Sequence, residues 1–507
     1  MEITRRSTLK ILAGSIMAGP TRMFASAPEP FEPTWESLEQ YRCPEWFRDA
    51  KLGIWTCWGP HTVPGRDDWY ARNMYIEDSP TYEHHVKTYG HPSKFGFKDF
   101  IPLWKGEKFD PDRLAALFKQ AGAKYLATLA TYHDNFDCFD SQYQRWNSVN
   151  MGPKKDIVGL WRQAALRYGL RFAVTEHLER SYSWFNVNKG HDKKGPYAGV
   201  PYDGNDPKYA DYYFEPHEDT NMGYPVSPPE SWKQNWFRRI KDLVDSYQPD
   251  LLYTDGGIPF GETGRQLLAY FYNQNRKLHG GRLEAVYNIK NINHLFPELN
   301  HGDYRDGVCV EDLERGVLSE IKVRPWQTDT SVGHWFWFKD DKYRSVANVI
   351  HMLADIVSKN GNLLLNFPLR PDGTLDPEPE SILSDLAKWM EVNSRAIHET
   401  RPWTVYGEGP TASGGGNFKE RLVAFTASDV RFTTNAGQLY AIVLGWPEED
   451  VKIKSLGTAA SLWQKKISRI RMLGSDEKIQ WSRDSECLVI RKPKQKPCEH
   501  AVVFVIA

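Results

Sequence analysis

Short apolar runs alternate with amphipathic segments between residues 50 and 370, and no other feature of the chain limits its possible folds as strongly. Eight of these runs have the length of a strand, and each ends in a polar or glycine-containing turn. Several are apolar on both faces, which is typical of buried parallel strands. The runs begin at Lys51, Lys124, Arg171, Asp250, Glu284, Gly307, Arg324 and Gly361.

The segments between many of these runs have the pattern of helices. Residues 110–123 begin with an Asp start signal and end with a Gly stop signal. Residues 157–169 and 231–247 place apolar side chains at three- and four-residue spacing. Eight strands that alternate with helices predict an α/β fold, a (β/α)8 TIM-like barrel. The gaps between the fifth and seventh runs are short, so we expect missing or irregular helices there.

The pattern changes after residue 400. From about Thr404 onward the chain has short runs of alternating apolar and polar residues that are separated by turn residues. This pattern predicts an antiparallel β domain, a C-terminal β-sandwich. With 507 residues the chain is long enough for two folded domains.

The N-terminus has the features of an export signal. Arg5 and Arg6 precede a mildly apolar stretch that ends at Gly19 and is too short to span a membrane as a stable helix. The small residues Ala25–Ala27 fit a cleavage site. We expect twin-arginine export and a periplasmic or secreted bacterial protein; a disordered N-terminus is the alternative. The predicted parts are a signal segment (1–30), a catalytic barrel (31–400) and a β-sandwich (401–507).

The composition favours a carbohydrate ligand over a nucleic acid or a membrane. The formal net charge is -1, and no later segment is long and apolar enough for a membrane span. Aromatic residues make up 13% of the chain, with 19 Trp. Trp rings cover the C–H faces of pyranoses while nearby polar groups reach the hydroxyls. A large Trp-rich core explains the composition equally well. The six Cys are scattered without zinc spacing.

A carboxylate, Asp255, ends the fourth run, where side chains line the active site of such a barrel. Together with the aromatics it suggests glycoside hydrolysis, which usually needs two carboxyl groups. The second comes from the acidic cluster of Glu311, Asp312 and Glu314. The alternatives are a turn Asp before Gly for Asp255, and an ion pair with Arg315 or a lysine for Glu314.

Five ordered motifs resemble those of glycoside hydrolase family 29, the α-L-fucosidases. They begin at Trp46, Gly122, Pro249, Arg324 and Asn360. The resemblance covers roughly residues 35–400, and the β tail also fits. It implies a retaining, exo-acting enzyme that releases fucose from oligosaccharides or polysaccharides without a metal or cofactor. It places Asp255 at the nucleophile position and Glu314 at the acid/base position, with Glu311 as the reserve.

Several sugar-binding positions differ from the family pattern. Cys57 and Tyr132 stand where the family has His, and Tyr253 stands where it has Trp. Asp68-Trp69 resembles a Glu-Trp pair, and Lys290 falls near a family Arg. Trp55 and the aromatic run His334–Phe338 are expected to form the pocket for the fucose methyl group. The residues expected to bind sugar are Trp55, Cys57, His61, Asp68, Trp69, Tyr132, His133, Glu176, His177, Tyr253, Lys290 and Trp326.

These departures leave three functions open. A fucosidase would replace the lost hydrogen bonds with other residues, such as His61, Glu176 or His177. A related glycosidase would act on an α-L-galactoside or a modified fucose. A carbohydrate-binding protein would bind sugar without cleaving it. Cys is a weak donor, and a lost hydrogen bond costs ~1–3 kcal/mol of discrimination. Because both candidate catalytic carboxyl groups are present, α-L-fucosidase is the main prediction.

The Gly-rich segment 407–418 has no Lys-Ser/Thr ending, so we expect a flexible loop there and not a phosphate cradle.

Overall fold

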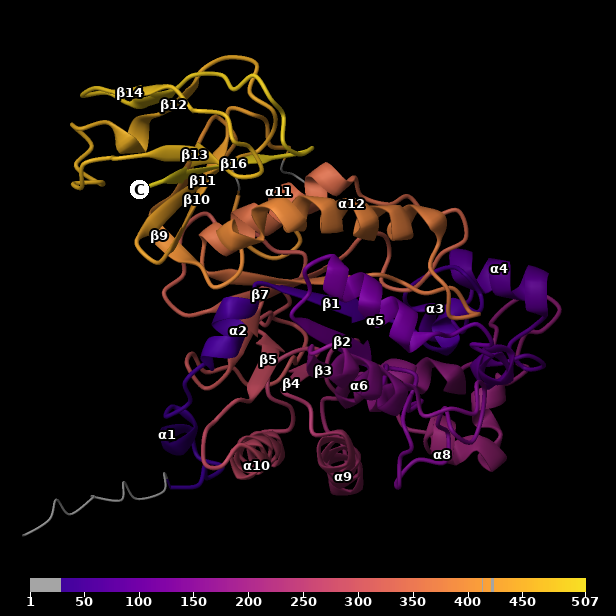
Figure 1. Ribbon diagram of the computed structural model, residues 1–507. Coiled ribbons are helices and arrows are strands. Elements are labelled where there is room, and N and C mark those ends of the chain that lie inside the picture. Colours follow the sequence, from indigo (N-terminus) through magenta and orange to yellow (C-terminus); the bar gives the residue numbers. More distant parts are fainter. Residues whose placement is uncertain (1–28, 413, 421–423) are drawn as a thin grey trace, which may run out of the picture.

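The computed structural model describes residues 29–412, 414–420 and 424–507, which form a parallel barrel and a smaller antiparallel β domain (Figure 1). The expected export signal, with Arg5, Arg6 and Ala25–Ala27, lies outside the described residues. Within the described ranges, no helix has both the length and the apolar character that crossing a membrane requires.

Eight parallel strands close into a barrel in chain order, and each of the eight predicted runs overlaps one of them. The first strand pairs with the second and also with the eighth, so that Trp55 lies opposite both Ala127 and Asn366. The predicted α/β barrel is therefore confirmed. The strands are β1 Leu52–Thr56, β2 Tyr125–Leu129, β3 Arg171–Glu176, β4 Leu251–Thr254, β5 Val286–Lys290, β6 Val310–Asp312, β7 Trp326–Ser331 and β8 Gly361–Asn366.

Helices cover the outside of the barrel, and local capping explains where several begin. Asp110 accepts a hydrogen bond from the backbone N–H of Arg113, and Asp156 accepts one from that of Gly159. The α-helices are α1 Trp35–Leu38, α2 Glu45–Ala50, α3 Tyr70–Asn73, α4 Pro80–Tyr89, α5 Pro111–Gln120, α6 Ile157–Arg167, α7 Ser181–Trp184, α8 Ala210–Tyr213, α9 Glu230–Tyr247, α10 Glu262–Leu278, α11 Val346–Ser358 and α12 Pro377–Asn393.

Shorter 3₁₀ helices lie in the connections. They are η1 Pro60–Thr62, η2 Phe97–Leu103, η3 Leu178–Arg180, η4 Phe185–Lys189, η5 Asp203–Asn205, η6 Pro207–Tyr209, η7 Ser394–Ala396 and η9 Lys454–Leu456. The described connections 291–309 and 313–325, which join β5 to β6 and β6 to β7, contain no helix. The short gaps in the sequence had predicted this irregularity.

The two-residue period of the strands decides which side chains enter the barrel. Inside it, the hydroxyl of Tyr125 donates to Oε1 of Gln327 at 2.8 Å, and that of Tyr253 donates to Oδ2 of Asp329 at 3.1 Å. Asp255 follows Tyr253 by two positions and therefore continues the inward row at the C-terminal mouth of the barrel.

The C-terminal domain consists of two antiparallel sheets, one with the order β13-β16-β11-β10-β9 and one with the order β12-β15-β14. Phe432, Ile453, Leu488 and Phe504 come from both sheets and share one buried cluster, which confirms the sandwich. The described part of the run 422–427 forms no strand. The strands are β9 Arg401–Glu408, β10 Val430–Asn435, β11 Gln438–Val443, β12 Val451–Ile453, β13 Ile470–Met472, β14 Trp481–Arg483, β15 Leu488–Ile490 and β16 Val502–Ile506.

The sandwich packs on α11 and α12 of the barrel (Figure 1). Arg431 of β10 forms a buried ion pair with Asp355 of α11, with Nε 2.6 Å from Oδ1. The indole N–H of Trp389, on α12, donates to the carbonyl of Ala501 at 2.9 Å. These buried polar contacts hold the two domains in one relative orientation.

Candidate active site

A cavity of about 950 Å³ opens at the C-terminal ends of the barrel strands. This is the end at which barrels of this class carry out their chemistry. Ten of the residues expected from the sequence line this cavity: Trp55, Cys57, Asp68, Trp69, Tyr132, His133, His177, Asp255, Lys290 and Glu314.

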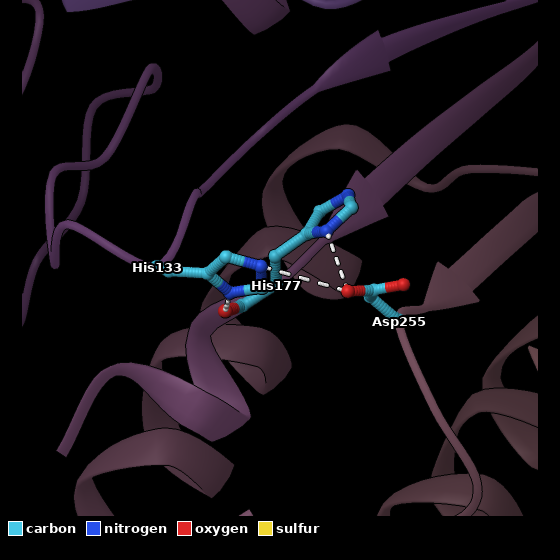
Figure 2. Close-up of side chains that lie close together, drawn as sticks. All are labelled: His133, His177 and Asp255. Carbon is cyan, nitrogen blue, oxygen red and sulfur yellow. Dashed lines mark hydrogen bonds and ion pairs between the residues drawn. The ribbon is translucent and has the colours of Figure 1, made fainter. Parts of the chain in front are cut away.

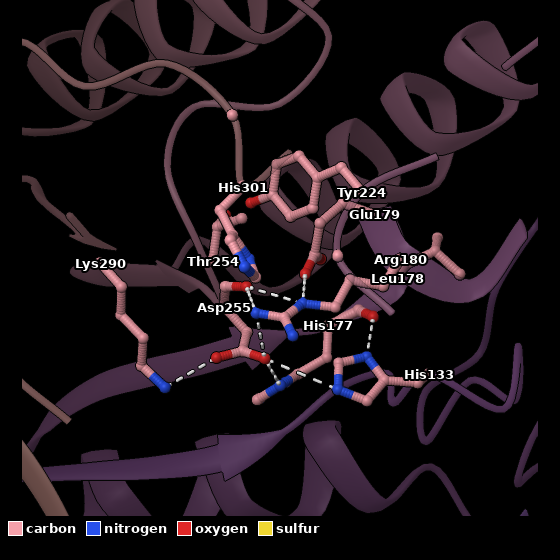
Figure 3. Close-up of polar contacts among 12 residues, drawn as sticks. His133, His177, Leu178, Glu179, Arg180, Tyr224, Thr254, Asp255, Lys290 and His301 are labelled. Atoms are coloured by element: carbon pink, nitrogen blue, oxygen red, sulfur yellow. Dashed lines mark hydrogen bonds and ion pairs between the residues drawn. The ribbon is translucent and has the colours of Figure 1, made fainter. Parts of the chain in front are cut away.

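Asp255 lies immediately after β4, with its carboxylate between two cations (Figure 3). Nζ of Lys290 is 2.7 Å from Oδ1, and Nη2 of Arg180 is 3.3 Å from Oδ2. Arg180 also donates to the backbone carbonyl of Asp255, at 2.8 Å from Nη2 and 3.2 Å from Nε. Burial alone would raise the pKa of Asp255, but the charges of Arg180 and Lys290 hold it well below its usual range. Asp255 is therefore ionised at neutral pH.

Lys290, the last residue of β5, connects the carboxylates of the site. Its Nζ lies 2.7 Å from Asp255, 2.7 Å from Oε2 of Glu314 and 3.6 Å from Oδ2 of Asp329. Burial lowers the pKa of Lys290, but the three anions raise it well above its usual value, so the ammonium group stays charged. Since the nearest oxygens of Asp255 and Glu314 touch the same nitrogen, they cannot be farther apart than twice 2.7 Å.

Glu314 lies two positions after β6 on the inward row, and 18% of its side chain is exposed. Burial raises the pKa of this carboxyl group. Lys290 opposes the shift, while the charges of Asp329 and Asp255 add to it. Asp255 and Glu314 therefore differ in protonation tendency: one is held ionised and the other is pushed toward its neutral form.

Glu311 does not reach the cavity, so its place as the reserve acid/base was wrong. It lies three positions before Glu314, an odd offset, so the strand period turns it to the outer face of β6. There it forms an ion pair with Lys322 and accepts a hydrogen bond from the hydroxyl of Tyr304 at 3.3 Å.

Two histidines lie against Asp255 (Figure 2). Nε2 of His133 is 3.6 Å and Nδ1 of His177 is 3.4 Å from Oδ2 of the carboxylate. Nδ1 of His133 donates to the carbonyl of His177 at 2.8 Å, which leaves Nε2 as an acceptor in the neutral ring. Burial, together with the charge of Arg180, holds the pKa of His133 well below its usual value. This neutral histidine can accept a hydrogen bond from a substrate hydroxyl.

The side chains of His133, His177 and Asp255 could together hold a metal ion, since their ligand atoms lie within 4.8 Å of one another. The local charge opposes a metal ion. Arg180 and Lys290 already contact both oxygens of Asp255, and a divalent ion there would add to two positive charges. The donor set therefore fits substrate binding better than metal binding.

Aromatic and acidic side chains form another part of the cavity wall. Trp55 packs between His177 and Trp335, with ring centroids 6.0 and 5.3 Å away. The carboxylate of Asp68 accepts the backbone N–H of Phe336 at 3.0 Å, and burial raises its pKa to about 6. The wall combines flat apolar faces with a hydrogen-bonding carboxyl group, as a pyranose requires.

Cys57 and Tyr132 both reach the cavity. Burial raises the pKa of the Cys57 thiol well above its usual value, so the residue is a neutral thiol. The hydroxyl of Tyr132 donates to the backbone carbonyl of Asp68 at 3.2 Å. Neither side chain offers the ring nitrogens of a histidine to a ligand.

Four residues expected to bind sugar do not line the cavity, and the prediction of direct contact was wrong for them. Glu176 and Trp326 face outward by the strand period. The carboxylate of Glu176 accepts a hydrogen bond from the hydroxyl of Thr254 at 2.7 Å, and the indole N–H of Trp326 donates to the carbonyl of Lys359 at 2.8 Å. Tyr253 points inward but lies below the cavity, on Asp329. His61 lies behind the wall, where its Nε2 is 3.6 Å from Asp134.

Sequence reasoning missed Arg180, Asp329 and Arg315, which line the cavity together with Trp335 of the expected aromatic run. Arg180 follows β3 in the polar stretch after its strand end, the same signal that identified His177. Asp329 is a charged residue inside a barrel strand, which was a recognisable signal because strand interiors are usually apolar. The guanidinium of Arg315 lies 4.7 Å from the ring centroid of Trp335.

Comparisons with known proteins agree with this geometry. The family model "Alpha-L-fucosidase" matches residues 21–395, and "Alpha-L-fucosidase C-terminal domain" matches residues 424–507. The tissue alpha-L-fucosidase of Mus musculus is 28% identical over 502 residues, covering 95% of this chain and 94% of that protein. The human tissue enzyme is 28% identical over 489 residues, covering 93% of this chain and 90% of that one.

Solved structures show the same likeness. The crystal structure of Thermotoga maritima alpha-fucosidase in complex with fucose matches with a TM-score of 0.71 at 27% identity, covering 94% of this chain and 100% of that one.

Proposed function

This chain belongs to the α-L-fucosidase family, and from that premise we propose that it is an exo-acting, retaining α-L-fucosidase that releases terminal fucose from oligosaccharides or polysaccharides. The observation that carries the proposal is the contact of Asp255 and Glu314 with one lysine nitrogen, each at 2.7 Å. Because twice that distance is the upper limit for the nearest oxygens, the pair is compatible with the ~5–5.5 Å separation of retaining enzymes and is closer than the ~6.5–9.5 Å of inverting ones.

The first step forms a covalent intermediate. The ionised carboxylate of Asp255 attacks the anomeric carbon of the fucosyl unit while the bond to the leaving oxygen breaks. Glu314 gives its proton to that oxygen, so the aglycone leaves as a neutral alcohol. The low pKa of Asp255 and the raised pKa of Glu314 match these two roles.

The second step releases fucose. Once Asp255 is esterified, its negative charge is lost, and one of the causes that raise the pKa of Glu314 disappears. Glu314 is then a carboxylate that removes a proton from water as the water attacks the anomeric carbon. The ester bond to Asp255 breaks, and two inversions leave the configuration of the sugar unchanged.

A glycosidase for a closely related sugar is the second candidate, and one observation favours it. Cys57 and Tyr132 line the cavity at positions where the family has His. A thiol is a weak donor, and the Tyr132 hydroxyl is already bonded to the backbone of Asp68. Sugar hydroxyls that bind to the His residues of the family lack those hydrogen bonds here, and each lost bond costs ~1–3 kcal/mol of binding free energy. An α-L-galactoside or a modified fucose presents a different set of groups to the same wall.

Turnover of two aryl glycosides by protein lacking residues 1–27 tests both candidates. We expect release from the α-L-fucoside, with the α anomer as the first product by NMR, and its loss in Asp255→Asn. Release from the α-L-galactoside alone would support the second candidate. Binding of fucose without turnover of either glycoside, unchanged by Asp255→Asn, would identify a carbohydrate-binding protein instead.

We also propose that the protein is exported to the periplasm or secreted. The proposal rests on the paired Arg5 and Arg6 and on the apolar stretch that follows them. Fractionation of cells that express the full chain tests it. Arg5→Lys with Arg6→Lys should keep the protein in the cytoplasm, and export of that variant would contradict the twin-arginine assignment.

A further inference from the structure

The Gly-rich connection between β9 and β10 reaches from the sandwich domain to the catalytic cavity. Gly416 pairs with Val317 in a short antiparallel bridge, with N···O distances of 2.8 and 3.2 Å. The N–H of Phe418 donates to the carbonyl of Glu314 at 2.9 Å, and that of Lys419 donates to the carbonyl of Arg315 at 2.9 Å. The segment 414–420, which overlaps the expected flexible loop 407–418, is therefore bonded to the loop that carries Glu314.

Glu420 anchors this segment to the barrel. Its side chain is buried, and Oε1 accepts from Nη2 of Arg344 at 2.5 Å and from the hydroxyl of Thr330 at 3.1 Å. Within the described part of the chain, its other oxygen, Oε2, has no hydrogen-bond partner. Glu420 also lines the cavity, so this buried acceptor without a partner lies at the cavity wall.

Phe418 presents an uncovered aromatic ring to the same cavity. Its side chain lines the cavity, and the residue is 46% exposed although it is a large apolar residue. Its backbone lies in the left-handed region, with φ +60°, and the hydrogen bond to Glu314 holds it there. Non-glycine residues in this region are uncommon and concentrate at functional sites.

The position of Glu314 shows which part of the substrate lies next to Phe418. A general acid must lie within hydrogen-bond reach of the leaving oxygen. The cavity-lining residues next to Glu314, such as Phe418, therefore face the leaving group. The cavity of about 950 Å³ is at the upper end of the ~300–1,000 Å³ that hold drug-sized ligands, and a single monosaccharide does not fill it.

We propose that the segment 414–420 of the sandwich domain forms a binding site for the leaving group, in which Phe418 packs on the C–H face of a pyranose ring. Glu420 accepts a hydrogen bond from a hydroxyl of that ring. The second domain then completes the active site and selects the aglycone, while the barrel selects the terminal sugar. This inference rests on the proposed fucosidase function.

Phe418→Ala tests the proposal with two donors that differ only in the leaving group. α-L-Fucosyl fluoride has no ring to place on Phe418, whereas a fucosyl oligosaccharide does. The oligosaccharide is the one that the unmodified protein hydrolyses fastest from a panel of the common linkages. The ratio of kcat/KM for oligosaccharide to that for fluoride should fall about three- to ten-fold in Phe418→Ala. Phe418→Tyr, which keeps the ring, should retain the original ratio.

Leu103→Ala is the matched control, because Leu103 is 47% exposed and lies outside the cavity. It should leave the ratio unchanged, and thermal unfolding of both variants checks that they fold. An unchanged ratio in Phe418→Ala would overturn the leaving-group site while the fucosidase function stands. Hydrolysis of the fluoride but of no oligosaccharide would also overturn it. If the unmodified protein hydrolyses neither donor, the fucosidase function itself fails, and this inference fails with it.

Discussion

Lys290 and Glu314 form an ion pair at the mouth of the barrel, with Nζ 2.7 Å from Oε2, and the same nitrogen lies 2.7 Å from Asp255. The lysine side chain is only 3% exposed, so water screens these contacts weakly. Its charge favours the ionised form of both carboxyl groups, which suits a nucleophile and opposes a general acid. Burial and the charges of Asp329 and Asp255 outweigh that opposition at Glu314.

Replacing the lysine should therefore move the pH dependence of catalysis. In Lys290→Met the carboxyl groups lose their shared cation, and the pKa of Asp255 rises because, after Arg180, Lys290 is the next charge that lowers it. We expect kcat/KM to fall on the order of 10²-fold. The acidic limb of its pH profile should shift to higher pH. Lys290→Arg keeps the charge and should keep the limb near its original position. An unshifted limb in Lys290→Met would contradict the electrostatic role.

The roles of the two neighbouring acids should separate by mutation. Glu314→Gln removes the proton donor, so hydrolysis of oligosaccharides should fall about 10²–10⁴-fold. The fall should be smaller for fucosyl fluoride, whose leaving group needs less protonation. Glu311→Gln is the matched control, because that side chain lies on the outer face with Lys322. Steady-state kinetics on both donors would reject the assignment if Glu311→Gln lost more activity than Glu314→Gln.

Acid should destabilise the fold through a buried histidine outside the active site. The ring of His398 shares a hydrogen bond with the carbonyl of Ala50 at 2.8 Å, and burial lowers its pKa to about 4. The unfolded chain binds a proton near pH ~6.5, so His398 contributes stability above that pH. This stability is lost as the pH falls from there toward about 4.

Urea unfolding at pH 7 and pH 5 measures this effect. The drop in the free energy of unfolding between the two should be about 2 kcal/mol smaller in His398→Asn than in the original protein. Equal drops in both proteins would show that His398 does not titrate on unfolding.

The contact between the domains should depend on a buried ion pair. Both Arg431 and Asp355 have side chains that are 2% exposed, and their charged atoms lie 2.6 Å apart. Asp355 also pairs with Lys359, whose Nζ lies 2.7 Å from its Oδ2, so removing Asp355 leaves two buried cations without their shared anion. Asp355→Leu should therefore lower the free energy of unfolding by about 3–5 kcal/mol. Arg491→Met, which breaks an exposed pair with Asp450, should leave unfolding almost unchanged. Similar melting temperatures for the two variants would contradict the argument.

Local patterns were enough to predict the elements of this fold. Each barrel strand overlaps a run that is apolar and ends in a turn, because strand formation and burial depend on a few consecutive residues. The position of Asp255 at a strand end was visible for the same reason. The strand period also separates Glu311 from Glu314, but only once the start of β6 is known.

The sequence by itself determined the barrel, the sandwich and the positions of Asp255 and Glu314, since these follow from periodicity and from motifs within short segments. Only the tertiary structure decided that Arg180 and Lys290 meet on Asp255 and that Phe418 lies beside Glu314. Those contacts join residues that are distant in the chain, such as Glu314 and Phe418. Closure of the barrel and docking of the second domain set their distances, and no local pattern encodes either.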